Sequence, residues 1–311
     1  MNKIAQLLPV VMFSLSVVTG QTKQLCVTVD DLPVVAYGIP DTSYQREIIT
    51  NLTRGLAAAH APAIGFVNEQ KLHDSSGLSP FRVSLLEQWL DTGLDLGNHT
   101  YSHPDINKIT CVEYFADVIR GEAVTKDLLQ RRGRTLRHFR HPFLYLGSTK
   151  EVADSLSTFL AGRNYVTAPV TIDNDDYMFA AMYHRAYARR DTADAKKIGR
   201  EYVEYLEKKL QYYERQSVNL FGRPIAQVLL IHASRLNADH IGQLLSMIMK
   251  NGYTFADLAT VLKDEAYRTP ITVYKKYGIS WLDRWAISAG KTGDFFKDEP
   301  DVPSYIRAGW R

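Results

Sequence analysis

Short apolar segments that end abruptly at polar residues recur along this chain, and stretches with helical spacing separate them. The apolar segments are 25–29, 63–67, 94–97, 136–139, 165–170, 228–231 and, more weakly, 253–255. The stretches between them that have helical spacing are 43–60, 79–92, 112–132, 150–163 and 237–251. Alternation of strands and helices is typical of βαβ units and a parallel sheet. We therefore predict an α/β fold of the (β/α) barrel kind, with about seven strands.

An open, doubly wound sheet is the competing architecture, since it is built from the same units. No glycine-rich, phosphate-cradling loop follows the first apolar segment, which counts against a dinucleotide-binding version of that fold. With 311 residues and 45% hydrophobic content, the chain is large enough for a single α/β domain with a full core.

Three parts of the chain depart from the repeat. Residues 1–20 combine Lys3, a short apolar run and small residues, which predicts a signal peptide on a secreted or periplasmic protein. The run is too short for a comfortable membrane span, and an uncleaved N-terminal anchor is the alternative. Within the main domain, 21–268, the charged and tyrosine-rich segment at about 177–220 predicts a helical insertion over or beside the barrel. Residues 269–311 form a C-terminal extension that we expect to pack on the domain.

Charge and cysteine content exclude some classes of function. The formal net charge is only +3, so nothing indicates the clustered basic face of a nucleic-acid-binding protein. Cys26 and Cys111 have no cysteine or histidine neighbour at metal-ligand spacing. We interpret them as buried free thiols, with a disulfide as the alternative.

Polar clusters follow five of the predicted strands, at the point where each strand ends. The clusters are Thr28 to Asp31, His99 to His103, Arg140 to Phe143, Asp173 to Tyr177 and Leu230 to His232. Functional groups of a (β/α) barrel converge at the carboxyl ends of its strands. We therefore expect the five clusters to form one site.

The residue types in these clusters are typical of a metal-dependent hydrolase. His99 and His103 have the spacing of one helical turn, so both imidazoles can face one point, and one carboxylate completes a set that leaves positions open for water and substrate. Of the adjacent Asp30 and Asp31, one can bind the metal while the other accepts a proton from the water. The sequence alone leaves open which aspartate does which. A further histidine can protonate the leaving group, and Arg140 can orient a carboxylate.

Together the five clusters resemble the motifs of the polysaccharide deacetylases with a NodB-homology domain, carbohydrate esterase family 4. The family patterns T-F-D-D, H-[ST]-x-x-H, R-x-P-[FY], D-x-x-D-W and L-x-H occur in this order, with Val29 in place of the phenylalanine and Tyr177 in place of the tryptophan. The resemblance covers about residues 25–262 and implies a distorted (β/α) barrel of the NodB-homology type.

The resemblance also implies a role for each site residue. Asp31, His99 and His103 would hold a divalent metal, usually Zn²⁺, with Co²⁺, Ni²⁺ and Mn²⁺ as alternatives. Asp30 would be the general base and His232 the general acid. Arg140 would orient Asp30, and Asp173 would tune His232. The backbone N–H of Phe143 would stabilise the oxyanion, and Tyr177 would line the substrate pocket.

The implied function is removal of an acyl group from a carbohydrate or a sugar-like amide, and the leading candidate for this group is N-acetyl. An O-acetyl esterase acting on a polysaccharide and a non-catalytic carbohydrate-binding protein are the alternatives. Leu144 stands where the family commonly has a glycine. We expect Leu144, Tyr145 and the helical insertion to add bulk at one end of the substrate groove, which favours short ligands over long polymers.

Overall fold

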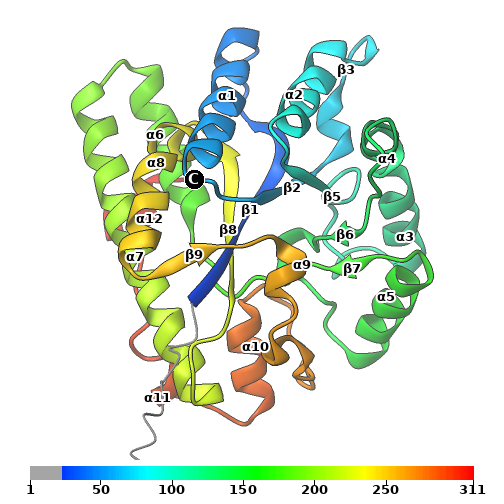
Figure 1. Cartoon of the computed structure of the whole chain (residues 1–311), viewed down its shortest axis with the longest axis vertical. Coiled ribbons are helices and arrows are strands. Elements are labelled where there is room, and N and C mark those ends of the chain that lie inside the picture. The colour runs from blue at the N-terminus through cyan, green and yellow to red at the C-terminus, as the bar shows by residue number, and fades with distance from the viewer. Residues whose placement is uncertain (1–22) are drawn as a thin grey trace, which may run out of the picture.

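The protein is built around a curled parallel sheet, and the computed structural model describes residues 23–311 (Figure 1). The strands follow the order β7-β6-β5-β2-β1-β8, and β9 pairs with the first residues of β1. The strands of this sheet are β1 (Lys23–Val35), β2 (Ala63–Val67), β5 (Asp95–Asn98), β6 (His138–Phe139), β7 (Val166–Thr167), β8 (Gln227–Ser234) and β9 (Tyr253–Phe255). The predicted α/β fold with a curled, barrel-like parallel sheet is confirmed, in the form of a half-barrel.

A single segment of chain shows how strongly the sheet curls. Val166–Thr167 pairs with β6 at one edge of the sheet, and the N–H of Ala168 donates to the carbonyl of Phe139. Four residues further on, Ile172 forms a parallel bridge to Leu229 in β8, at the other edge. Because one short segment reaches both edges, the carboxyl ends of the strands face a common centre.

Helices cover the outside of the sheet. They are α1 (Thr42–Ala58), α2 (Pro80–Asp91), α3 (Cys111–Arg120), α4 (Ala123–Gln130), α5 (Lys150–Gly162), α6 (Asp176–Ala188), α7 (Thr192–Phe221), α8 (Arg235–Lys250), α9 (Leu258–Val261), α10 (Trp281–Ser288), α11 (Gly293–Phe296) and α12 (Ser304–Gly309). Short 3₁₀ turns occur at Glu69–Leu72, Pro142–Leu144 and Glu265–Arg268, and β3 (His73–Asp74) pairs with β4 (Gly77–Leu78). In Figure 1, α6 to α8 lie on one flank and α3 to α5 on the other.

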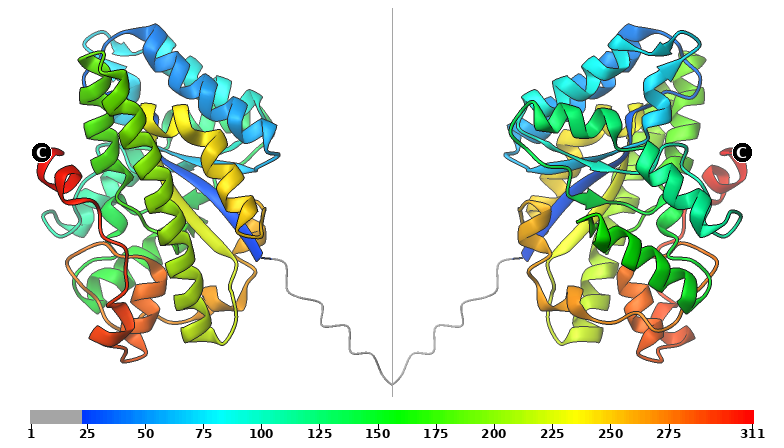
Figure 2. Two further views of the ribbon diagram at one scale, coloured as in Figure 1. Left: turned by 90° about the vertical axis from the view of Figure 1, so that its left-hand side faces the viewer. Right: turned by 90° about the vertical axis from the view of Figure 1, so that its right-hand side faces the viewer.

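Burial of an apolar stripe holds each main helix against the sheet. In α1, Ile48, Ile49, Leu52 and Leu56 recur at helical spacing and are fully buried. Burying each such side chain stabilises the fold by about 1.5–3 kcal/mol. The segment expected to form a helical insertion contains α6 and α7, which pack on each other and on α8. The C-terminal segment runs along one side of the molecule (Figure 2).

The single helix predicted over 112–132 is wrong, because the chain forms α3 and α4 with a break at Gly121. A Cβ atom at Gly121 would overlap the backbone of Thr100 and Tyr101, so the helix ends where a loop crosses it. Cys26 is a buried free thiol, and Cys111 is a free thiol that is only half-buried.

The predicted signal peptide, 1–20, lies outside the described residues. Within residues 23–311, no helix has the length and apolar character needed to cross a membrane.

Candidate active site

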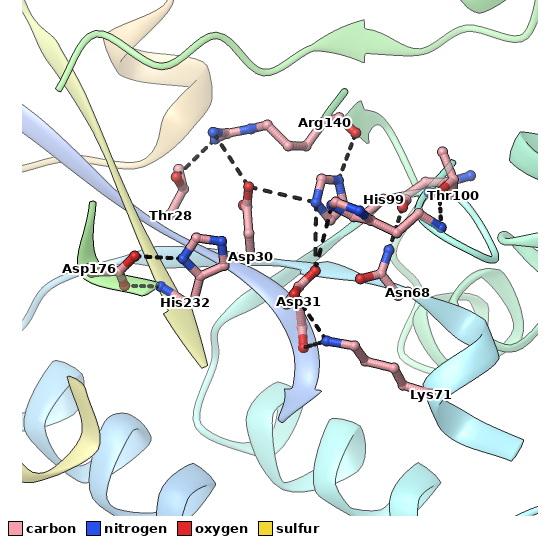
Figure 3. Close-up of polar contacts among 12 residues, drawn as sticks. Thr28, Asp30, Asp31, Asn68, Lys71, His99, Thr100, Arg140, Asp176 and His232 are labelled. Carbon is pink, nitrogen blue, oxygen red and sulfur yellow. Dashed lines mark hydrogen bonds and ion pairs between the residues drawn. The ribbon is translucent and has the colours of Figure 1, made fainter. Parts of the chain in front are cut away.

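Strand register brings the polar clusters to one edge of the sheet. Asp30 in β1 lies opposite His232 in β8, and Asn98 in β5 lies opposite Phe139 in β6. His99 and Arg140 directly follow this second pair, so they leave the sheet side by side. The expected convergence of side chains at the carboxyl ends is therefore present in the structure (Figure 3).

An irregularity in β1 allows both aspartates to serve this site. Successive side chains of a regular strand point to opposite faces of a sheet. Between Val29 and Leu32 the register of β1 against β2 shifts, and Asp31 has a φ of 70°. This bulge redirects the chain, so Asp30 and Asp31 both approach His99, with Oδ–Nε2 distances of 3.8 and 3.9 Å.

The prediction that His99 and His103 share a helical turn is wrong, because this segment is a loop. Thr100 and His103 have φ values of 67° and 59°, in the left-handed region. These two left-handed residues turn the chain so that the ring centroids of the two imidazoles lie 4.8 Å apart. The histidines therefore converge by a loop conformation that their spacing does not predict.

Asp117 in α3 holds this loop. Its carboxylate accepts hydrogen bonds from the backbone N–H of Tyr101 (2.8 Å), the backbone N–H of Ser102 (2.9 Å) and the hydroxyl of Ser102 (2.7 Å). Gly121, one turn later, allows the loop to cross the helix end without a steric clash. The break between α3 and α4 thus serves to position the two histidines.

Asp31, His99 and His103 form a group that fits a metal ion. One ligand atom from each lies within 4.8 Å of the others. Within residues 23–311, the buried Asp31 Oδ1 has no hydrogen-bond partner, and it lies 3.9 Å from Nε2 of both histidines. The backbone carbonyl of Arg140 accepts a hydrogen bond from Nδ1 of His99 at 2.8 Å, which places the proton on Nδ1 and leaves the Nε2 lone pair facing the group.

Lys71 is a part of the site that the sequence did not reveal. Its Nζ lies 3.1 Å from Asp31 Oδ2 and donates a hydrogen bond to the Asp31 carbonyl at 3.1 Å. Burial acts to raise the pKa of Asp31, but the Lys71 ammonium and the nearby imidazoles outweigh it and lower that pKa well below its usual value. Lys71 thus occupies one oxygen of Asp31 and leaves the other for a cation. No motif marks Lys71, which follows β2 in a 3₁₀ turn.

Asp30 has the environment of a proton acceptor. Its side chain is 4% exposed, and Oδ1 has no hydrogen-bond partner among the described residues. Burial raises the pKa of Asp30 to about 6, although Arg140 and His232 act in the opposite direction. Arg140 Nη1 lies 3.8 Å from Asp30 Oδ2, and Arg140 Nη2 donates to the Thr28 hydroxyl at 2.8 Å. Arg140 therefore lies where the resemblance places it, beside Asp30.

The carboxylate that holds His232 is Asp176, which corrects the expectation for Asp173. Asp176 Oδ1 accepts a hydrogen bond from His232 Nδ1 at 2.7 Å, and Oδ2 accepts one from the His232 backbone N–H at 2.8 Å. Both aspartates belong to the motif, but Asp176 is the first residue of α6, where Asn174 accepts a hydrogen bond from its N–H. Asp173 is half-buried, and burial raises its pKa to about 7.

The environment of His232 favours its charged form. Burial acts to lower the pKa of His232, but the contact with the Asp176 carboxylate outweighs it and raises the pKa to about 9. Asn237 donates to Asp176 at 2.6 Å, and Tyr202 of α7 donates to Asn237 at 2.7 Å. This chain of hydrogen bonds fixes the carboxylate, and through it the ring of His232. The sequence pattern gave no sign of Asn237 or Tyr202.

The outer side of the site is formed by side chains that are partly accessible to solvent. His103, Asp31 and His232 have side chains that are 21–27% exposed, whereas His99 and Arg140 are almost fully enclosed. Solvent therefore reaches the group from the side of His103 and His232.

The loop that contains Phe143 lies beside His103, and the start of α6, at Asp176, lies beside His232. Phe143 is 48% exposed, and its ring meets the ring of His103 edge-on at a centroid distance of 4.4 Å. Tyr177 is 39% exposed and contacts Trp310 edge-on at 5.2 Å. Leu144 is buried in the core, so the expectation that it adds bulk to the groove is wrong.

Residues 18–157 match the family model described as "Polysaccharide deacetylase". The comparison with curated proteins gives no significant match. Similar solved structures include a peptidoglycan deacetylase from Bacillus subtilis, with 16% identity over 80% of this chain and 94% of that chain and a TM-score of 0.47. A family 4 carbohydrate esterase from Bacillus anthracis has 18% identity over 78% of this chain and 85% of that chain, with a TM-score of 0.47. A CE4 family pseudoenzyme from Bacillus anthracis has 14% identity over 78% of this chain and 66% of that chain, with a TM-score of 0.47.

Proposed function

We propose that the protein is a metal-dependent hydrolase that removes an N-acetyl group from a carbohydrate, and the match of residues 18–157 to the family model described as "Polysaccharide deacetylase" supports this proposal. The observation that carries this proposal is the meeting of three ligand atoms, from Asp31, His99 and His103, with Asp30 and His232 at one edge of the sheet. A protein that only binds sugar or metal needs neither a buried proton acceptor nor a carboxylate-supported imidazole.

The donor set is typical of Zn²⁺, because two imidazoles and one carboxylate leave positions open for water and substrate. Co²⁺, Ni²⁺ and Mn²⁺ bind the same kinds of donor. When bound, such a cation supplies Lewis-acid chemistry: it polarises the acyl oxygen and lowers the pKa of a bound water molecule.

The residues of the chain would perform the proton transfers. Asp30, as carboxylate, accepts a proton from the attacking water while the water oxygen bonds to the acyl carbon. The Phe143 N–H, which has no hydrogen-bond partner within residues 23–311, donates to the developing oxyanion. His232, protonated on the nitrogen that faces away from Asp176, donates that proton to the leaving nitrogen as the C–N bond breaks. The products are a carboxylic acid and a free amine.

Acetate release from a panel of N-acetylated and O-acetylated glycans, with and without a chelator, tests the proposal. We expect release from N-acetylated members, loss of activity with chelator and recovery on addition of Zn²⁺. Release from O-acetylated members alone would favour the esterase alternative. Binding of glycans by the metal-loaded protein without any release would identify a non-catalytic carbohydrate-binding protein.

We also propose that the protein acts in a secreted or periplasmic location, after removal of residues 1–20. Intact-mass analysis of exported protein should give a chain that begins near Gln21. Retention of Met1 in the exported protein would refute cleavage.

A further inference from the structure

We propose that Arg284 and Gly278 of the C-terminal extension are positioning residues, which hold the loop that presents the Phe143 N–H. This inference rests on the proposed function, because that N–H is assigned to the oxyanion there. The loop belongs to the cluster Arg140 to Phe143, and the two residues lie more than 130 positions later, outside the family match at 18–157. Neither residue belongs to a motif of the site.

The loop has a backbone conformation that needs external support. Phe143 and Leu144 are consecutive non-glycine residues with φ values of 55° and 56°. Each such residue costs about 1 kcal/mol or more, and the conformation persists only where the surroundings enforce it. Leu144 adopts this left-handed conformation without the freedom that a glycine would have there. Support for this backbone must therefore come from its contacts.

Arg284 provides one of these contacts. Its side chain is buried, and Nη2 donates a hydrogen bond to the carbonyl of Leu144 at 2.8 Å and to the carbonyl of Tyr277 at 3.3 Å. Burial lowers the pKa of Arg284 to about 10, so the guanidinium is still charged at neutral pH. A charged donor makes a hydrogen bond about twice as strong as a neutral one. The bond therefore fixes the peptide group that follows Leu144.

Gly278 provides the second contact. A Cβ atom at this position would overlap the carbonyl oxygen of Phe143 and would also press on Leu144 Cβ. Only glycine allows the extension to lie directly against the peptide group between Phe143 and Leu144. Two consecutive peptide groups of the loop are thus held, one by hydrogen bonding and one by close packing. The same part of the extension reaches the segment after His103, where the Asn107 side chain donates to the Lys276 carbonyl at 3.3 Å.

A displaced loop would misdirect the Phe143 N–H and leave the metal ligands in place. The expected effect of a change at Arg284 or Gly278 is therefore on kcat, with little effect on KM or on metal content. Removal of one oxyanion donor typically lowers kcat about a hundredfold or more, and partial displacement should cost about tenfold.

The experiment compares Arg284→Gln and Gly278→Ala with matched control variants in the same extension. Arg307 forms an exposed ion pair with Asp301, and Gly293 has no neighbour within 4 Å of an added Cβ, so Arg307→Gln and Gly293→Ala serve as the controls. For each metal-loaded variant, kcat and KM for acetate release and amide hydrogen exchange of residues 140–147 are measured. We expect lower kcat, KM within about twofold and faster exchange in the two test variants only.

Three further outcomes decide the matter. If Arg284→Gln folds poorly, Gly278→Ala and Arg284→Lys remain informative, since a lysine ammonium can still donate to the Leu144 carbonyl and should restore part of kcat. Test variants with the same kcat and exchange as their controls would overturn the proposal. If the wild-type protein releases no acetate, the proposed function fails, while the exchange data still show whether Arg284 and Gly278 hold the loop.

Discussion

Asp176 binds His232 through both carboxylate oxygens, one to the Nδ1 of the ring and one to the backbone N–H. Because the backbone and the ring of the same residue are both fixed, the imidazole has one orientation, with Nε2 on the side that faces away from Asp176. The negative charge also stabilises the imidazolium, which is the form that a general acid needs. His232 therefore has, at neutral pH, the protonation state that its proposed role as general acid requires.

Substitution of Asp176 should change the pH dependence of activity. The acid form of His232 is present below its pKa of about 9, so activity should fall as the pH rises through this value. Asp176→Asn removes the charge that raises the pKa, and the alkaline limb of the pH–kcat profile should move to lower pH by about one unit or more. Asp173→Asn is the control, and a larger shift in Asp173→Asn than in Asp176→Asn would restore the expectation made from the sequence. A bound cation lowers the pKa of His232 in the wild type and in both variants. The comparison therefore uses the difference in pH between the alkaline limbs of the three proteins.

Asp30→Asn should separate metal binding from catalysis. The asparagine has the same size but cannot accept the proton of the attacking water, so kcat should fall about a hundredfold or more. The metal content should stay at that of the wild type, because Asp31, His99 and His103 are unchanged. In the wild type, activity should be lost as the pH falls through the Asp30 pKa of about 6, since the protonated carboxyl is no base. Near-normal turnover by Asp30→Asn, measured as acetate release, would move the base to another residue.

Asp117 should affect metal affinity although it is not one of the three proposed metal ligands. Asp117→Ala removes all three hydrogen bonds that hold the loop between His99 and His103. Loss of such a supporting group typically weakens metal binding about 10- to 100-fold. Isothermal titration of the metal-free protein with Zn²⁺ measures this, with Asp127→Ala as the control, because Asp127 pairs with Arg131 on the exposed side of α4. Equal affinities in the two variants would show that Asp117 does not position the loop.

The exposed ring of Tyr177 should contribute to substrate binding. Tyr177 follows Asp176 at the start of α6 and packs against Trp310, and we propose that its exposed ring contacts the substrate. Tyr177→Ala should raise KM for N-acetylglucosamine oligomers several-fold and change kcat little, because stacking acts on the ground state and the transition state alike. Tyr187→Ala, at the far end of the same helix, is the control. An unchanged KM in Tyr177→Ala would remove this residue from the substrate site.

Much of the fold could be predicted because strands and helices leave regular patterns of apolar residues. Each of the seven predicted apolar segments overlaps a strand, from β1 to β9. Strand ends also predicted which polar residues would meet, since parallel strands present their carboxyl ends to one edge. The break in the helix over 112–132 could not be predicted, because Gly121 is explained by a loop from elsewhere in the chain.

The finer geometry of the site depends on contacts that are distant in the sequence. Lys71 approaches Asp31 across 40 residues, and Arg284 reaches Leu144 across 140 residues. The choice between Asp173 and Asp176 depends on where α6 begins, and the paired use of Asp30 and Asp31 depends on a bulge in β1. Such features follow from backbone conformation and tertiary packing, which residue type and spacing do not encode.

We propose above all that acyl hydrolysis depends on a cation held by Asp31, His99 and His103. The most direct test is a titration of metal-free protein with Zn²⁺, in which bound metal and the rate of acetate release from an N-acetylated glycan are measured on the same samples. We predict that the rate rises in proportion to bound metal and reaches its plateau at about one equivalent, and that His99→Ala and His103→Ala lose both. A rate that is independent of bound metal, or full metal binding by both histidine variants, would contradict the account.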